Sequence, residues 1–184
     1  MSKAALKKEL AGFDRMQLTQ IILDIYDCNK SAKDYLEFFI NPDVKRLRDR
    51  FDRALAKELR RSKRGYSKAR ISHIRNLLKE FRSFQPGEEA VREAMLHVIT
   101  ESLAEEYDTT FPATMTEGIA GLMEQFVLFC DEHEALQWAL ERLDHLLLLP
   151  RKPGVFISAR MRRMLNERLN AFLAGMGLHR TGAE

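Results

Sequence analysis

Apolar residues recur three and four positions apart along almost the whole chain, which is the spacing that places side chains on one face of an α-helix. The clearest stripe consists of Val44, Leu47, Phe51, Leu55 and Leu59, with lysine and arginine on the other sides of the same segment. The alternation of apolar and polar residues that marks a strand is almost absent. The pattern therefore predicts an all-α protein of about eight or nine helices.

Capping residues, prolines and glycines mark where these helices begin and end. Asp14 followed by Gln17 has the pattern of a capping box. Further N-caps are predicted at Ser31, Ser67 and Thr114. Short connections predict antiparallel hairpins packed into an irregular bundle, with the wide apolar face between Thr114 and Cys130 at its centre. A helical repeat is the alternative, although no residue signature recurs at a fixed period.

The length of 184 residues predicts a single helical domain, residues 1–184. The alternative is a subdivision into a basic N-terminal half, residues 1–84, and a C-terminal half, residues 86–178, that is first acidic and then basic. No signal peptide is recognisable and no apolar run reaches the roughly 18–20 residues that span a bilayer, which predicts a cytoplasmic protein with no membrane partner. The two cysteines, Cys28 and Cys130, lie in apolar helical patterns and are predicted to be buried.

Charge is distributed very unevenly along the chain. Residues 45–82 hold 15 of the 30 lysine and arginine residues and four acidic residues, a net charge of +11. Residues 83–149 hold two basic and 14 acidic residues, a net charge of −12. We call residues 45–82 the basic hairpin, because a turn at Arg64, Gly65 and Tyr66 joins its two predicted helices. Ten arginines against five lysines favour bidentate contacts with phosphate or carboxylate groups.

The predicted anion-binding residues cluster around this turn. Cations there can engage phosphates, and Tyr66 offers a ring on which a base or sugar can stack. The predicted site consists of Arg60, Arg61, Lys63, Arg64, Tyr66, Lys68 and Arg70. The alternative is that the acidic residues of 83–149 neutralise the basic hairpin within the fold.

No arrangement of residues in the sequence indicates catalysis. The chain contains no Gly-x-Ser-x-Gly elbow and no phosphate-binding glycine loop. Glu93, His97 and Glu101 lie four residues apart on one predicted helix face, but their spacing differs from the Glu-x-x-His pattern of di-iron bundles. We therefore predict a protein that is not an enzyme, with no catalytic residues, no metal site and no cofactor.

These observations favour a binding module whose basic hairpin engages an anionic partner, either nucleic acid or an acidic protein. The alternative is a protein–protein interaction scaffold or a homodimer whose charges are neutralised within the fold. Such a protein would use an apolar helix face, for example Leu146–Leu149 or the final helix around Met161–Leu173.

Short motifs in the N-terminal half resemble those of a known family. They are Ser2-Lys3, Leu6-Lys7-Lys8-Glu9-Leu10, Gln17-Leu18, Ile22-Leu23-Asp24-Ile25-Tyr26, Lys33, Tyr35-Leu36-Glu37-Phe38-Phe39, Asn41-Pro42, Lys63-Arg64 and Ile71-x-x-Ile74-Arg75. Together they resemble an uncharacterised family of small bacterial all-helical proteins, a domain of unknown function, over roughly residues 2–82. The resemblance implies a bacterial cytoplasmic protein and implies neither an activity nor site residues.

Overall fold

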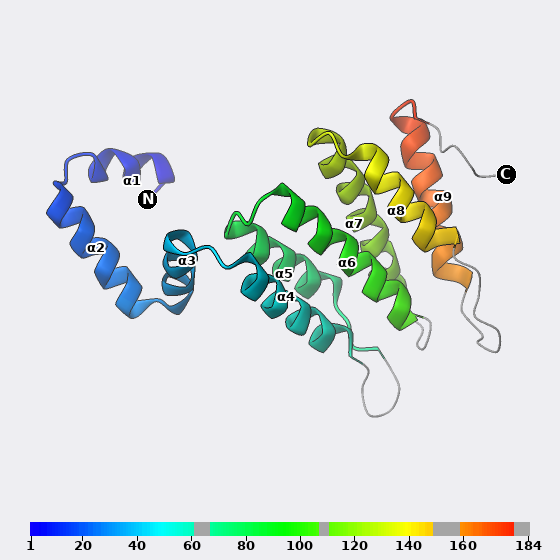
Figure 1. The fold of residues 1–184 in the computed structure, drawn as a ribbon, viewed down its shortest axis with the longest axis horizontal. Coiled ribbons are helices and arrows are strands. Elements are labelled where there is room, and N and C mark those ends of the chain that lie inside the picture. Colours follow the sequence, from blue (N-terminus) through cyan, green and yellow to red (C-terminus); the bar gives the residue numbers. More distant parts are fainter. Residues whose placement is uncertain (61–66, 107–110, 149–158, 179–184) are drawn as a thin grey trace. The chain divides into compact units, whose positions relative to one another are not determined.

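The computed structural model describes residues 1–60, 67–106, 111–148 and 159–178, and the regular elements in these ranges are all helices (Figure 1). The helices are α1 (Lys3–Leu10), α2 (Arg15–Cys28), α3 (Lys30–Ile40), α4 (Val44–Leu59), α5 (Ile71–Ser83), α6 (Glu88–Glu106), α7 (Ala113–Glu132), α8 (Leu136–Leu148) and α9 (Ala159–Gly175). The structure confirms the predicted all-α bundle. No described helix combines the length and the apolar content that crossing a bilayer requires.

The chain divides into two compact units, which we call unit 1 (Met1–Asp43) and unit 2 (Val44–Glu184). This boundary lies earlier than the subdivision at residues 84–86 that the charge pattern suggested. The reason is that the basic helices α4 and α5 pack on α6 and α7, so the change in charge does not coincide with a change of packing unit.

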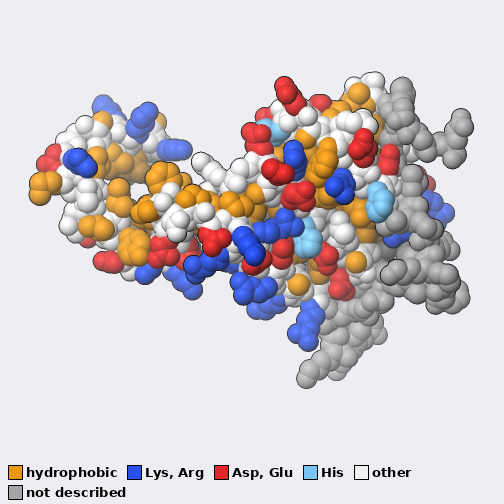
Figure 2. Space-filling view, viewed as in Figure 1, with side chains coloured by type: hydrophobic (Ala, Val, Ile, Leu, Met, Phe, Trp, Pro, Cys, Tyr) orange, Lys and Arg blue, Asp and Glu red, His pale blue; other side chains and the backbone are white. Residues whose placement is uncertain are grey.

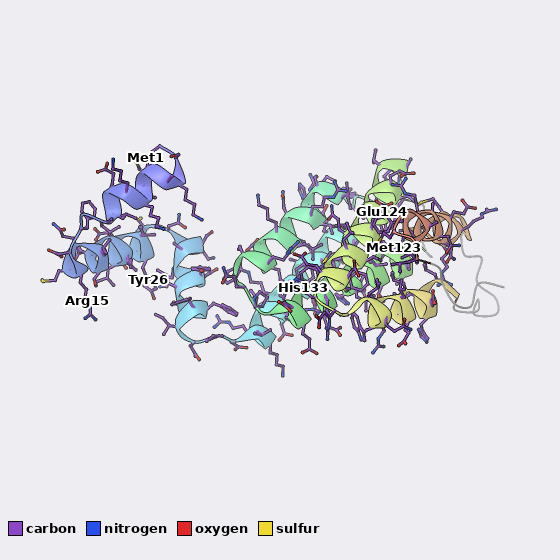
Figure 3. All side chains as sticks on the ribbon, turned by 90° about the horizontal axis from the view of Figure 1, so that it is seen from above. Met1, Arg15, Tyr26, Met123, Glu124 and His133 are labelled. Carbon is purple, nitrogen blue, oxygen red and sulfur yellow. The ribbon has the colours of Figure 1, made fainter. Side chains whose placement is uncertain are left out.

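Unit 2 is built from successive helix pairs that lie side by side (Figure 1). α4 packs on α5 and α6, while α7 packs on α5, α6, α8 and α9. Nine residues of α7 are buried, including Met123, which Figure 3 labels among the surrounding helices. The central position predicted for this helix is therefore confirmed.

The core of unit 2 follows the apolar stripes of its sequence. Leu47, Phe51, Leu55 and Leu59 of α4 are buried, as the stripe predicted. They meet a matching stripe on α5, where the rings of Phe51 and Phe81 lie 5.2 Å apart between centroids. Burying such side chains contributes about 1.5–3 kcal/mol each, so these stripes hold the basic hairpin together.

Helix starts agree with the sequence in part. The capping box of α2 is present, with the Gln17 backbone N–H donating to Asp14 Oδ1 (2.8 Å) and the Asp14 N–H donating to Gln17 Oε1 (3.0 Å). For α3 the predicted cap Ser31 was wrong, because Asn29 ends α2 and its side chain accepts from the Ala32 N–H (3.1 Å).

Two further predicted caps were wrong. α7 starts at Ala113, and the carbonyl of the N-cap residue Pro112 already accepts the Met115 N–H (2.9 Å) and the Thr116 N–H (3.2 Å), so Thr114 lies inside the helix. Ser67 accepts from the nearby Ala69 N–H (3.2 Å), whereas α5 starts only at Ile71. Its hydroxyl therefore closes a local turn instead of capping α5.

Unit 1 contains no buried residue, since each of residues 1–43 is at least partly exposed. Cys28 on α2 is accordingly exposed, and the prediction that it is buried was wrong. The helical pattern of α2 was correct, but within unit 1 its apolar face has no core to join. Cys130 on α7 is buried, as predicted.

Candidate anion-binding surface

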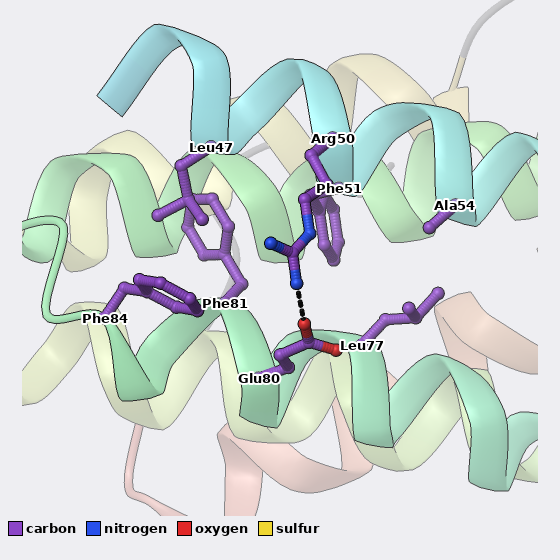
Figure 4. A pocket seen from close by; sticks show the side chains of 8 residues that line it. All are labelled: Leu47, Arg50, Phe51, Ala54, Leu77, Glu80, Phe81 and Phe84. Carbon is purple, nitrogen blue, oxygen red and sulfur yellow. Dashed lines mark hydrogen bonds and ion pairs between the residues drawn. The ribbon is translucent and has the colours of Figure 1, made fainter. Parts of the chain in front are cut away.

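α4 and α5 run antiparallel and are joined by ion pairs near both ends. Arg50 of α4 bonds to Glu80 of α5 at one end (Figure 4). At the other end His73 Nδ1 of α5 lies 3.3 Å from Glu58 Oε2 of α4. This pairing places the end of α4 and the start of α5, next to which Arg60, Lys68 and Arg70 lie, at the same end of the hairpin.

A small pocket lies between the two helices, and the Arg50–Glu80 pair is part of its lining (Figure 4). The Arg50 guanidinium also lies over the Phe84 ring, 5.8 Å from its centroid. The cavity measures about 60 Å³, far below the roughly 300–1,000 Å³ of typical small-molecule sites. The pocket is therefore a packing gap between α4 and α5 that is too small for a typical ligand.

The structure describes three of the seven predicted site residues: Arg60, Lys68 and Arg70, all exposed. The other four, Arg61, Lys63, Arg64 and Tyr66, lie outside the described residues. Arg60 follows α4 directly, and its N–H still donates to the Ala56 carbonyl (3.0 Å) as in a helix. Lys68 precedes α5.

Lys57 belongs to the same end of the hairpin and was missing from the predicted site. It is exposed and lies three residues before Arg60, which places both side chains on one helix face. This spacing was visible in the sequence. We call Lys57, Arg60 and Lys68 the tip cations; the described residues include no carboxylate paired with any of them.

Arg70 differs from the tip cations because it is engaged within the hairpin. Its backbone N–H donates to Glu58 Oε1 (3.0 Å), and its Nε lies 3.4 Å from the same oxygen. Its guanidinium also lies 2.8 Å from His73 Nδ1. Arg70 is the N-cap residue of α5 and makes no side-chain cap itself, while the Glu58 carboxylate of α4 accepts one of the free N–H groups at this helix start.

Other carboxylates of unit 2 form ion pairs with cations or histidines that are not tip cations. Asp52 pairs with Arg48 of its own helix (2.7 Å) and with His97 of α6 (3.4 Å). In the acidic segment 83–149, Glu88 lies 3.0 Å from His133, and Glu89 lies 3.6 Å from Arg92. These two acidic side chains pair with residues outside the basic hairpin.

Two more carboxylates of the acidic segment meet Arg168 of α9. Glu124 Oε1 lies 2.8 Å from its Nε and Glu117 Oε2 lies 3.7 Å from its Nη1. The hydrogen bond and charge of Glu124 raise the pKa of the Arg168 guanidinium further above its ordinary value. Figure 3 labels Glu124 and His133, which lie on α7 and directly after it. These interactions connect α7 with α9 and α6, and none of them involves a tip cation.

Other cations of the hairpin extend the charged surface. Figure 2 shows lysine and arginine side chains gathered over α4. On α5 the Arg82 guanidinium lies over the Phe129 ring of α7, 5.4 Å from its centroid. That arginine therefore covers an aromatic ring, a contact that leaves its charge intact.

The described residues give no positive indication of catalysis. They contain no group of three or more histidine, cysteine or carboxylate side chains arranged to hold a metal ion. His97 lies 3.9 Å from Glu101 Oε1, but its other neighbour is Asp52 of the hairpin. Burial raises the pKa of the Cys130 thiol to about 11, which keeps it protonated and unreactive near neutral pH.

The described residues form an all-α protein in which the tip cations of the basic hairpin are exposed. Residues 1–128 match a family of unknown function (DUF6155). Because the match covers more than half of the chain, the protein belongs to this family. The family match confirms the resemblance seen in residues 2–82 and extends it through α6 into α7. No curated protein and no solved structure matches the chain.

Proposed function

We propose that the protein is a non-enzymatic binding module whose basic hairpin engages an anionic partner, either a nucleic acid or an acidic protein. The observation that carries the proposal is the exposure of the tip cations Lys57, Arg60 and Lys68 without a carboxylate partner among the described residues. Cations that are exposed and have no carboxylate partner remain available to phosphate or carboxylate groups. They attract these groups over roughly a Debye length, about 10 Å at 0.1 M salt.

The distribution of the ion pairs supports an external partner. Glu58 and Glu80 of the hairpin pair with cations of the hairpin itself. Glu117 and Glu124 of the acidic segment pair with Arg168 instead. Exposed pairs of this kind contribute only about 0–1 kcal/mol each, so they organise the surface more than they stabilise the fold. The net positive charge of the hairpin tip is therefore available for binding.

Fluorescence anisotropy tests the proposal with three labelled polyanions: single-stranded RNA, duplex DNA and polyglutamate. We expect binding at about 50 mM salt that weakens steeply toward about 200 mM, because bound phosphates release condensed counterions. Polyglutamate stands for an acidic protein and separates the two classes of partner. If none of the three binds at about 50 mM salt, the proposal is wrong.

A matched pair of variants tests the location of the site. Lys57→Glu, Arg60→Glu and Lys68→Glu together should weaken binding at least about tenfold, because like charges then face the polyanion. The control combines Lys3→Glu, Lys7→Glu and Lys8→Glu on the exposed helix α1, which changes the net charge equally. Equal losses from both variants would mean that net charge, and not the hairpin tip, governs binding.

A further inference from the structure

Exposed apolar side chains are concentrated in unit 1. Eleven large apolar side chains of the described residues are exposed, and ten of them belong to unit 1. Met16, Phe39 and Ile40 expose 82%, 71% and 81% of their surface. Figure 2 shows hydrophobic side chains at many places on the surface of unit 1. The exception in unit 2 is Leu128 on α7. Exposed apolar surface of this density marks an interaction site.

Unit 1 has local order without a core of its own. The α2–α3 pair is joined by the single residue Asn29, and the Tyr26 hydroxyl donates to Glu37 Oε1 (3.0 Å) across it. Lys33 Nζ lies 4.8 Å from the centroid of the Tyr26 ring, which Figure 3 labels. These surface contacts set how α2 meets α3. They do not replace hydrophobic burial, without which a unit of about 40 residues is rarely stable alone.

We propose that unit 1 is a dimerisation element, in which the α2–α3 pairs of two copies of this chain pack against each other and bury these apolar side chains. Two helix pairs supply the four helices of a four-helix bundle. Closed two-fold dimers are also the commonest assemblies of soluble proteins. The inference concerns unit 1 alone and stands independently of anion binding by the basic hairpin.

The exposed area fits a dimer interface. Seven of the ten side chains lie on α2 and α3; they expose between 37% and 82% of their surface and offer roughly 600 Å² per copy, at about 150 Å² for a fully exposed large side chain. A standard interface buries about 800 Å² on each partner, of which a little over half is apolar. α2 and α3 therefore carry enough apolar surface for a symmetric interface.

The charge of unit 1 also favours a second copy over a strongly charged partner. Residues 1–43 contain six basic and seven acidic residues, a net charge of −1. Two copies therefore meet almost without electrostatic repulsion, whereas a highly acidic or basic protein would find no complementary field. Of the apolar faces that the sequence suggested for a dimer, Met161, Leu165, Leu169 and Leu173 of α9 are buried in unit 2, and so is Leu147 of α8, while Leu149 lies outside the described residues.

Analytical ultracentrifugation of the full chain between about 1 and 100 μM tests this inference. We expect a dimer whose dissociation constant rises at least about tenfold with Ile22→Glu, because that change buries an unpaired carboxylate in the interface. Leu128→Glu is the matched control, since Ile22 and Leu128 each expose 48% of their surface. The Leu128→Glu variant should remain a dimer. The variant that combines Lys57→Glu, Arg60→Glu and Lys68→Glu should remain a dimer as well.

A second variant guards against an effect confined to one helix. Phe39→Glu on α3 should weaken the dimer in the same way, while far-UV circular dichroism confirms that both variants keep their helices. A wild-type monomer at about 100 μM would overturn the inference, whether unit 1 then packs on unit 2 of its own chain or awaits a different protein. A dimer sensitive to Leu128→Glu and insensitive to Ile22→Glu would overturn it as well.

Discussion

Gly118 on α7 occupies a position where a larger residue has no room. A Cβ atom at this position would lie 2.2 Å from Cγ1 and 2.8 Å from Cβ of Ile71 on α5. Ile71 is β-branched, so its side chain has few alternative rotamers with which to move aside. Gly118 therefore allows α5 to pack directly on α7, which fixes the basic hairpin to the centre of unit 2.

Replacing this glycine should weaken the fold. We expect Gly118→Ala to lower the free energy of unfolding by about 1–3 kcal/mol through overpacking against Ile71. Gly121→Ala on the same helix is the control, because its Cβ would meet only Arg75 Nη2 at 3.4 Å. Alanine is favoured over glycine in a helix interior by up to about 1 kcal/mol, so Gly121→Ala should leave the stability unchanged or raise it. Urea denaturation that gave both variants the same stability would refute this view of the α5–α7 contact.

The buried Cys130 thiol makes stability depend on alkaline pH. Burial raises its pKa from 9.0 to about 11, and the charge of Arg92 opposes this shift only partly. The folded protein thus retains a proton that the unfolded chain releases above pH 9. The corresponding stabilisation is complete below pH 9 and is lost as the pH rises toward 11.

This effect can be isolated with two alanine variants. Between about pH 8 and 10.5 the wild type should lose up to about 2 kcal/mol more stability than Cys130→Ala, which lacks the titrating thiol. Cys28→Ala should follow the wild type, because Cys28 is exposed. Urea unfolding at both pH values measures the difference. An equal loss of stability in the wild type and in both variants would show that Cys130 does not contribute to the pH dependence.

Individual core residues could be predicted more reliably than individual surface residues. Helical spacing identified Leu47, Phe51 and Leu55 as buried, because their stripe faces a second stripe in the same unit. The same spacing gave the wrong result for Cys28, since periodicity reports which helix face is apolar and not whether anything covers that face. Among the site residues, nothing in the sequence indicated that Arg70 is held by Glu58, a contact made only after the hairpin folds.

At the level of elements, α5 depends on α4 for its N-terminus. The Glu58 carboxylate accepts the Arg70 backbone N–H and also lies near the side chains of Arg70 and His73. A negative charge at this position is favourable because the N-terminus of a helix carries a partial positive charge. Glu58 thereby satisfies one free N–H group at the start of α5, the helix for which Ser67 was predicted as the cap.

Removing this carboxylate should loosen the tip of the hairpin. We expect Glu58→Ala to lower the free energy of unfolding by about 1–2 kcal/mol, the typical cost of losing a helix cap. Lys57→Ala, an exposed neighbour on the same helix, should change it by less than about 0.5 kcal/mol. Thermal or urea unfolding followed by circular dichroism distinguishes the two. If Glu58→Ala is as harmless as Lys57→Ala, the carboxylate does not act as a cap.

The existence of the helices followed from the sequence, but some of their exact starts did not. Long apolar stripes define α4, α5 and α7 well, because most residues of each stripe are buried. The predicted starts at Ser31 and Thr114 were misplaced, since Asn29 and Pro112, each two residues earlier, are the N-cap residues of these helices. Local capping patterns compete with one another, and the geometry of the chain decides between them.

At the scale of the whole molecule, charge and packing divide the chain differently. The sequence correctly separates a basic segment from an acidic one, but packing places both in unit 2. Which carboxylate meets which cation depends on the order in which the helices stack, and this order is absent from composition. Glu117 and Glu124 therefore meet Arg168 of α9, a partner far away in the sequence.

The most direct test of the account measures how the affinity for duplex DNA or RNA depends on salt. For the wild type we predict a linear fall of the logarithm of the binding constant with the logarithm of the salt concentration. Combining Lys57→Ala, Arg60→Ala and Lys68→Ala should make the slope shallower by roughly 0.9 for each DNA phosphate that is no longer neutralised, while Lys3→Ala, Lys7→Ala and Lys8→Ala should leave it unchanged. An unchanged slope in the hairpin variant, or an equal change in both variants, would contradict an anion-binding surface at the tip of the basic hairpin.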